Sequence, residues 1–170
     1  MEDVYLKVKR LNEKAILPSK RDEDAGYDVY GLFDSEAVFL KPGGIYLVSL
    51  GISTEFPNNW VLYITERSGS GSKGISTRAG VIDSGYRGEI KTPLNNTSEK
   101  LIVFSNLNID ELKEKYGDKF IGFEENFLIY PQDKAIAQAL LLYCPHVQIE
   151  EVFELGDSLR GEGGFGSTNK

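Results

Sequence analysis

The sequence predicts an all-β fold of many short strands within a single domain. Short runs rich in β-branched and aromatic residues recur along the chain, and turns such as Pro42-Gly43-Gly44 and Asn95-Asn96-Thr97 separate them. This pattern is typical of a β-sandwich or a barrel. With 170 residues, 41% of them hydrophobic, the chain can bury one core, so we assign residues 1–170 to one domain.

The expected strands run along the whole chain. Val4–Val8 alternates, so that Val4, Leu6 and Val8 share one face. Ala135–Tyr143 could also form a buried helix, but its place among other strands favours a strand. The remaining expected strands are Ala37–Leu40, Ile45–Leu50, Trp60–Thr65, Glu89–Leu94, Leu101–Phe104, Phe127–Tyr130 and Val147–Phe153.

One segment has the pattern of a helix instead. Asn108 can cap a first turn, Glu111 follows three residues later, and Gly117 comes after the last turn. The apolar residues that share one face of this helix are Ile109, Leu112 and Tyr116. Residues 105–124 are too few for a core of their own, so we interpret them as an insertion carrying one short helix.

The composition excludes several classes of function. The net charge of −7 argues against bulk electrostatic binding to nucleic acid or to an anionic membrane. The lone Cys144 cannot form an intramolecular disulfide, and the lone His146 excludes a multi-histidine zinc site. No apolar run reaches the roughly 20 residues of a membrane span, and the first residues do not resemble a signal peptide. We therefore expect a cytoplasmic protein.

Two stretches predict contacts with phosphate groups. Arg67-Ser68-Gly69 follows an expected strand and can present a guanidinium, a hydroxyl and an open backbone N–H group. The glycine-rich stretch at about 159–170 contains Arg160, and Phe165 lies among its glycines, where a ring could cover a flat ligand. The alternatives are a polar loop with a surface arginine and a mobile chain end.

Acidic residues near these stretches could act on a phosphate ester. Gly80–Glu89 predicts a β-hairpin with Asp83 and Tyr86 at its tip, and a carboxylate there could serve as general base on water. An aspartate that only stabilises its own turn is the alternative. Asp28, in an apolar strand-like segment, could hold Mg²⁺, and Gln138, in an apolar run, needs hydrogen-bond partners.

Taken together, five segments resemble, in order, the motifs of the homotrimeric dUTPase family. They are Ala25–Asp28, Arg67–Gly69, Gly80–Glu89, Ala135–Gln138 and Arg160–Thr168. The resemblance implies a jelly-roll-like subunit with a flexible C-terminal arm at about 159–170, and a homotrimer with active sites between subunits. It also implies Mg²⁺-dependent hydrolysis of dUTP to dUMP and pyrophosphate, which limits uracil in DNA and supplies dUMP.

The resemblance further implies roles for residues at the nucleoside end. Asp83 would activate the water that attacks the α-phosphorus, and Tyr86 would pack under the deoxyribose and leave no room for a 2′-hydroxyl. Phe165 would stack over the uracil. The residues that would surround the uracil edge, chiefly through backbone groups, are Gly80, Val81, Ile82 and Lys91, with Thr77 nearby.

At the phosphate end, the resemblance implies that Asp28 binds Mg²⁺ through water and that Arg160 reaches the γ-phosphate. The residues that would hold the phosphates are Arg67, Ser68, Gly69 and Gln138. Those that would close over them from the arm are Gly166, Ser167 and Thr168.

The insertion at 105–124 resembles the extra segment of dUTPases from staphylococcal phages, which bind repressors of mobile pathogenicity islands. This implies a bacterial pathogenicity-island repressor as a second partner and, if a phage encodes the protein, the host cell cytoplasm as its location. The alternative is an insertion that packs its apolar face on its own subunit. Two other functions are a nucleotide-gated regulatory module with little need for catalysis and a relative of dCTP deaminase.

Overall fold

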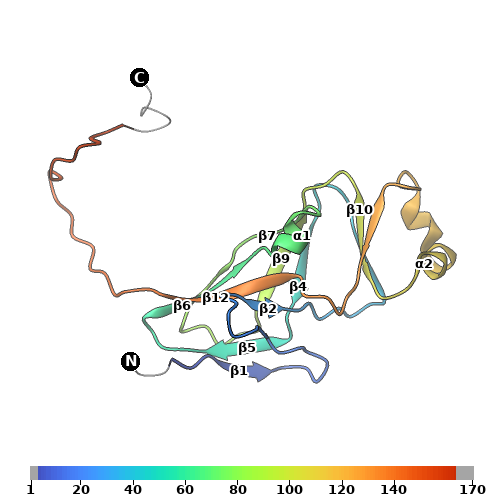
Figure 1. The fold of residues 1–170 in the computed structure, drawn as a ribbon, viewed down its shortest axis with the longest axis horizontal. Helices are drawn as coiled ribbons and strands as arrows, with labels where there is room; N and C mark the ends of the chain where they lie inside the picture. Colours follow the sequence, from blue (N-terminus) through green and yellow to red (C-terminus); the bar gives the residue numbers. More distant parts are fainter. Residues whose placement is uncertain (1–3, 164–170) are drawn as a thin grey trace.

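The structure, a computed structural model, describes residues 4–163 and has a framework of strands (Figure 1). The strands are β1 (Lys7–Arg10), β2 (Tyr27–Val29), β3 (Ala37–Leu40), β4 (Ile45–Ser49), β5 (Ile52–Glu55), β6 (Trp60–Thr65), β7 (Ile75–Thr77), β8 (Val81–Ile82), β9 (Lys91–Asn96), β10 (Leu101–Ser105), β11 (Phe127–Tyr130) and β12 (Ala137–Tyr143). The helices are α1 (Ser68–Gly71), α2 (Ile109–Tyr116) and the 3-10 helix η1 (Gly117–Phe120). The prediction of an all-β fold with one inserted helix in 105–124 is confirmed.

Within residues 4–163 the strands form four small sheets, with the orders β2-β12-β6-β8, β11-β10-β3, β4-β9-β7 and β1-β5. All pairs are antiparallel except β10 with β11. Strands that are distant in sequence are thereby neighbours: β12 lies between β2 and β6, with Gln138 opposite both Asp28 and Thr65. This pairing brings the first, second and fourth sequence motifs to one place.

Two apolar clusters hold the strands together. The larger one lies between the sheets and contains fully buried residues such as Leu94, Phe104 and Ile136. The smaller one packs the inserted helix against β10, with Leu112 and Leu101 completely buried. The insertion therefore packs its apolar face on its own subunit, as one of the two interpretations of the sequence expects.

The start of α2 follows the expected capping pattern. The Asn108 side chain accepts a hydrogen bond from the Glu111 backbone N–H at 3.0 Å, and the Glu111 carboxylate accepts one from the Asn108 N–H at 2.8 Å. Gly117 ends the helix but keeps a right-handed backbone (φ −54°), and the chain continues into η1. No helix within residues 4–163 is long and apolar enough to cross a membrane.

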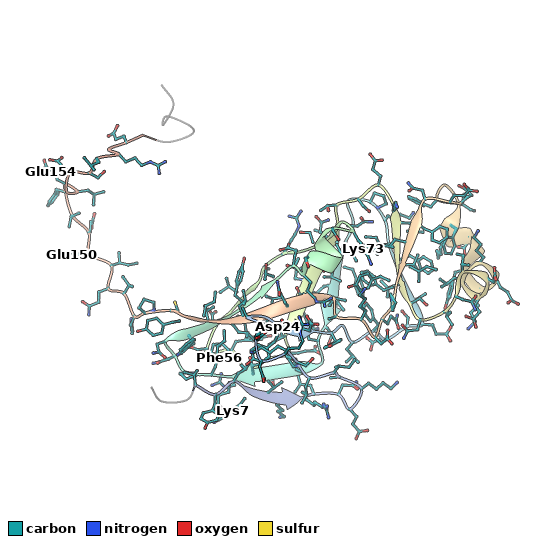
Figure 2. All side chains as sticks on the ribbon, viewed as in Figure 1. Lys7, Asp24, Phe56, Lys73, Glu150 and Glu154 are labelled. Carbon is teal, nitrogen blue, oxygen red and sulfur yellow. The ribbon has the colours of Figure 1, made fainter. Side chains whose placement is uncertain are left out.

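The prediction of a strand at Val147–Phe153 is wrong. From Cys144 to Gly163 the chain forms no strand and leads away from the sheets, as Figure 1 shows, and Glu150 and Glu154 project from this stretch in Figure 2. Ile149 and Phe153 are fully exposed. An alternating apolar run forms a strand only beside a partner edge, and these residues meet none within the subunit.

The prediction of a β-hairpin at Gly80–Glu89 is also wrong. A turn is present, with the Tyr86 N–H donating to the Asp83 carbonyl at 3.0 Å. However, β8 pairs with β6, and β9 pairs with β4 and β7, so the two arms belong to different sheets. Because the arms pair with other strands, they are not paired with each other, and residues of both arms line one pocket.

Other strand boundaries shift by a few residues. The first strand is Lys7–Arg10 rather than Val4–Val8, and Val4 is 43% exposed. The strand expected at Glu89–Leu94 is Lys91–Asn96. The sequence analysis did not single out the strands β5 and β7.

Candidate functional site

The expected phosphate-binding residues lie together around one groove of about 1100 Å³. We call it the Arg67 groove. Its lining includes Gly26, Asp28, Arg67, Ser68, Gly69, Lys134 and Gln138. Arg67 and Ser68 follow the end of β6, whereas Asp28 and Gln138 come from β2 and β12. The pairing of these three strands explains why residues separated by more than a hundred positions share one wall.

An ion pair organises this groove. The Nε–H and Nη2–H groups of Arg67 donate to the two carboxylate oxygens of Asp28 at 2.7 and 3.0 Å, and Nη1 donates to the Ala135 carbonyl at 3.1 Å. The Arg67 and Asp28 side chains are 25% and 35% exposed. This geometry fixes the plane of the guanidinium while leaving part of its surface open to the groove.

A hydrogen bond to the backbone holds the side-chain amide of Gln138. Its Nε2 donates one hydrogen to the Glu66 carbonyl at 2.7 Å, which leaves the second Nε2 hydrogen and the amide oxygen for other partners. A Cβ at position 26 would lie 2.6 Å from that oxygen, so Gly26 makes room for the amide. The sequence indicated that Gln138 needs partners but did not indicate the role of Gly26.

Glu66 is a structural residue that the sequence analysis missed. One of its carboxylate oxygens accepts hydrogen bonds from the Ser76 hydroxyl and the Thr77 N–H, both at 2.9 Å. Burial acts to raise the pKa of this carboxyl, but these bonds, together with its own N–H and the Thr65 hydroxyl, outweigh burial and hold the pKa below its ordinary value. Glu66, the residue before Arg67, is thus bonded to the last two residues of β7.

A second pocket, of about 420 Å³, lies between the open arms of the Gly80–Lys91 segment. We call it the Asp83 pocket. It is lined by Val81, Ile82, Asp83, Tyr86, Glu89, Ile90 and Lys91. Five of these are expected substrate or catalytic residues; Glu89 and Ile90 were not expected. The pocket combines apolar walls with an exposed carboxylate at the turn.

The Tyr86 ring is held across the turn. Its hydroxyl donates to the Glu89 carbonyl at 2.9 Å, and a Cβ at position 88 would lie 2.4 Å from that hydroxyl oxygen. The Ser49 hydroxyl donates to the Glu89 carboxylate at 2.5 Å. This bond, acting against burial and together with Lys91, lowers the pKa of Glu89 below its usual range. Hydrogen bonds thus hold two residues of the pocket lining, Tyr86 and Glu89.

Three expected site residues that the structure describes, Thr77, Gly80 and Arg160, line neither pocket. Gly80 packs so closely on β6 that a Cβ would lie 2.0 Å from the Ile64 carbonyl oxygen, and Thr77 is bonded to Glu66. Arg160 is exposed, lines neither pocket and donates to the Gly163 carbonyl at 2.7 Å. The expected residues that lie outside the described residues are Phe165, Gly166, Ser167 and Thr168.

Comparisons with known proteins identify the family. The dUTPase family model matches residues 12–107, more than half of the chain. The chain belongs to the dUTPase family. Curated relatives named deoxyuridine 5′-triphosphate nucleotidohydrolase are 38% identical in Clostridium tetani, with all of both chains covered, and 39% identical in Clostridium kluyveri, with 96% of each covered. The prediction of a dUTP-hydrolysing enzyme is confirmed.

Solved dUTPases share the fold. A Staphylococcus bacteriophage 80alpha dUTPase mutant with dUpNHpp superposes with a TM-score of 0.72 at 26% identity, covering 96% of this chain and 97% of the other. The EIAV dUTPase gives a TM-score of 0.64 at 19% identity, covering 91% and 100%. The second likeness shows the fold alone.

The donor set of this dUTPase fits a magnesium ion that is held mainly by its substrate. Residues 4–163 contain no cluster of three or more His, Cys, Asp or Glu side chains that could hold a metal. Asp28 supplies one carboxylate at the Arg67 groove, and both its oxygens also accept from Arg67. Mg²⁺ commonly keeps several waters and binds through one or two carboxylates and phosphate oxygens, so Asp28 and a bound triphosphate would together fit it.

Proposed function

We propose that each active site of this dUTPase forms between subunits of a homotrimer. The nucleoside would lie in the Asp83 pocket of one subunit and the triphosphate in the Arg67 groove of another. The observation that carries this proposal is that the two pockets share no lining residue among those described. Each subunit thus carries the residues proposed for the nucleoside and those proposed for the phosphates, but in two separate pockets.

Asp83 is the proposed general base. It orients a water toward the α-phosphorus and accepts its proton as the new P–O bond forms. The bond between the α-phosphorus and the bridging oxygen breaks, and pyrophosphate leaves while dUMP remains. The exposed position of Asp83 at the turn suits this role, because the carboxylate can reach a ligand that a neighbouring subunit holds.

The walls of the Asp83 pocket supply selectivity in this proposal. The Tyr86 ring, fixed by its bond to Glu89, fills the space beside the sugar and would collide with a 2′-hydroxyl. The backbone around Val81, Ile82 and Lys91 pairs with the uracil edge. Cytosine reverses a donor and an acceptor on that edge, which would leave buried polar groups unpaired.

The Arg67 groove holds the phosphates in this proposal. In this arrangement the phosphates would lie against Arg67, the Ser68 hydroxyl, the Gly69 N–H and the second Nε2–H of Gln138. Asp28 is the residue that would hold Mg²⁺, through water. When bound, Mg²⁺ neutralises part of the charge that develops on the leaving pyrophosphate.

The chain after β12 is the proposed link between subunits. Its fully exposed apolar side chains, Ile149, Phe153 and Leu159, need a covering surface, and a neighbouring subunit of the trimer would supply one. This course would bring Arg160 to the γ-phosphate and the segment Phe165–Thr168 over the nucleotide. We propose that residues from about 159 onward act as this closing arm of a single-domain subunit.

A nucleotide panel tests the proposed activity. With Mg²⁺, pyrophosphate release is expected from dUTP and not from UTP, dTTP or dCTP. Asp83→Asn, which keeps the size of the side chain, should abolish turnover and still bind dUTP. Normal turnover by Asp83→Asn would show that another group activates the water, and ammonia release from dCTP would indicate a deaminase.

A second role, binding of a pathogenicity-island repressor in the cytoplasm of a bacterial host, is supported by the outer surface of the insertion. Ile121 is 75% exposed beside a shallow apolar depression of about 230 Å³ next to Phe120. Structures of 80alpha dUTPase are described as showing that phage dUTPases control transfer of virulence genes. Ile121→Ser should weaken repressor capture and spare dUTP turnover; unchanged capture would remove the insertion from the contact.

A further inference from the structure

We propose that Lys134 is a further substrate-binding residue of the Arg67 groove, whose ammonium group contacts the β- or γ-phosphate and distinguishes dUTP from the product dUMP. The inference rests on the proposed function, because it assumes that the triphosphate lies in this groove. It adds a residue that none of the expected motif roles includes.

The charges that line the groove leave few free cations. Arg67 is paired with Asp28, and Arg21 is paired with Asp24 through two bonds of 2.9 Å. Each of these pairs is close to neutral as a unit. A triphosphate with several negative charges therefore needs a cation that is not already matched by a carboxylate.

Lys134 is such a cation. It lines the groove, and within residues 4–163 it forms no ion pair, in contrast to Arg67 and Arg21. The other unmatched lysine of the groove, Lys20, directs its ammonium group to the backbone carbonyls of Arg21 and Asp22 at 3.4 and 3.5 Å. Glu23 is the remaining carboxylate of the lining, and with Lys20 and Lys134 both positive the lining keeps a net positive charge, to which Lys134 contributes.

The turn that carries Lys134 is firmly anchored. The Lys134 N–H donates to the Pro131 carbonyl at 3.2 Å, and Gln132 fastens the turn to the strands behind it. The Gln132 amide donates to the carbonyls of Ser35 and Phe104 at 2.9 and 3.1 Å, and its N–H donates to the Asn106 side chain at 2.8 Å. The base of the lysine therefore has a fixed position relative to the groove.

A neighbouring aromatic ring also positions the ammonium group of Lys134. Lys134 Nζ lies 5.5 Å from the centre of the Tyr130 ring, within the range of a cation–π contact. The Tyr130 hydroxyl and Arg67 Nη1 donate to the same Ala135 carbonyl, at 2.7 and 3.1 Å. Lys134 and Arg67 are thus positioned around one buried tyrosine, and both line the same groove.

Two variants of Lys134 and one matched control test the proposal. Lys134→Gln removes the charge, whereas Lys134→Arg retains it. Lys113→Gln is the control, because Lys113 also lies over an aromatic ring, Phe127 at 5.8 Å, but lines a depression on the insertion. Titration calorimetry would measure the dissociation constants of dUpNHpp and of dUMP with Mg²⁺ in the full-length protein, and thermal unfolding would check folding.

Loss of the charge should weaken dUpNHpp binding about tenfold, as expected for one charge-assisted contact, and change dUMP binding by less than about twofold. Lys134→Arg and Lys113→Gln should bind both nucleotides like the wild type. The proposal is overturned if Lys134→Gln binds dUpNHpp normally, if it weakens both nucleotides equally, or if the arginine variant is as weak. If the wild type itself neither binds nor hydrolyses dUTP, the proposed function fails first.

Discussion

The guanidinium of Arg67 and the carboxylate of Asp28 form a two-pronged ion pair at 2.7 and 3.0 Å, although 39 residues separate them in the chain. The pair exists because β2 and β6 flank β12, so that the end of one strand faces the middle of another. The pair orients the arginine that we propose to bind phosphate.

Arg67→Lys should therefore lose more activity than stability. A lysine keeps the charge but cannot engage both Asp28 oxygens and the Ala135 carbonyl in one plane. We expect kcat/KM for dUTP to fall by about 100-fold, as for loss of a key positioning contact, and unfolding free energy to fall by only about 1 kcal/mol, since the pair is partly exposed. Steady-state kinetics and urea titration would measure the two effects. Equal kcat/KM values for the wild type and Arg67→Lys would show that the planar ion pair does not contribute to turnover of dUTP.

Gly80→Ala should disrupt the nucleoside side of the site. The new Cβ would lie 2.0 Å from the Ile64 carbonyl oxygen, which belongs to backbone and cannot turn aside. The variant should lose about 2 kcal/mol or more of stability, since β8 must move off β6. Gly117→Ala is the matched control: its Cβ would meet nothing within 4 Å, and φ is −54°. Calorimetric melting temperatures that match for both variants would contradict the close approach.

Glu66 should contribute stability that depends on pH. Its folded pKa is lowered, so the contribution is complete above the unfolded value of about 4.3 and is lost as pH falls through the lower folded value. Glu66→Gln keeps one oxygen for Ser76 and Thr77 but cannot ionise. The stability difference between wild type and variant should be constant from pH 8 to 6 and shrink below about pH 4.5. A difference that grows on acidification would refute the sign of this pKa shift.

Leu112→Ala should destabilise the whole subunit and not only the insertion. Leu112 is completely buried against β10, so the variant should lose about 2–4 kcal/mol. Ile121→Ser, on the exposed side of the same segment, should change stability by less than about 0.5 kcal/mol. Chemical denaturation measures both. A small effect at Leu112 would mean that the insertion folds separately from the sheets.

The sequence predicted this fold where local patterns decide it. The runs at Ala37–Leu40, Trp60–Thr65 and Phe127–Tyr130 form strands with those boundaries, and the Asn108 cap begins the helix as expected. These features depend on residues that are neighbours in the chain. The Val147–Phe153 run fails for the complementary reason, since a strand needs a partner edge that local alternation does not reveal.

The candidate site was predictable by residue type more than by arrangement. Resemblance to family motifs placed Asp28, Arg67 and Gln138 together, and the strand order of the structure agrees. It did not indicate the contribution of Glu66 or the anchoring of the Lys134 turn by Gln132. Both depend on tertiary hydrogen bonds between segments that are far apart in sequence, and no local pattern encodes them.

Mixing two inactive variants tests most directly whether the Asp83 pocket and the Arg67 groove of different subunits make one active site. Asp83→Asn and Arg67→Gln subunits would be purified, unfolded together, refolded and assayed for pyrophosphate release from dUTP. If sites form between subunits of a trimer, every mixed trimer has one site with both native residues, and an equal mixture should recover about a quarter of wild-type activity. Activity no greater than that of the separate variants would contradict the account.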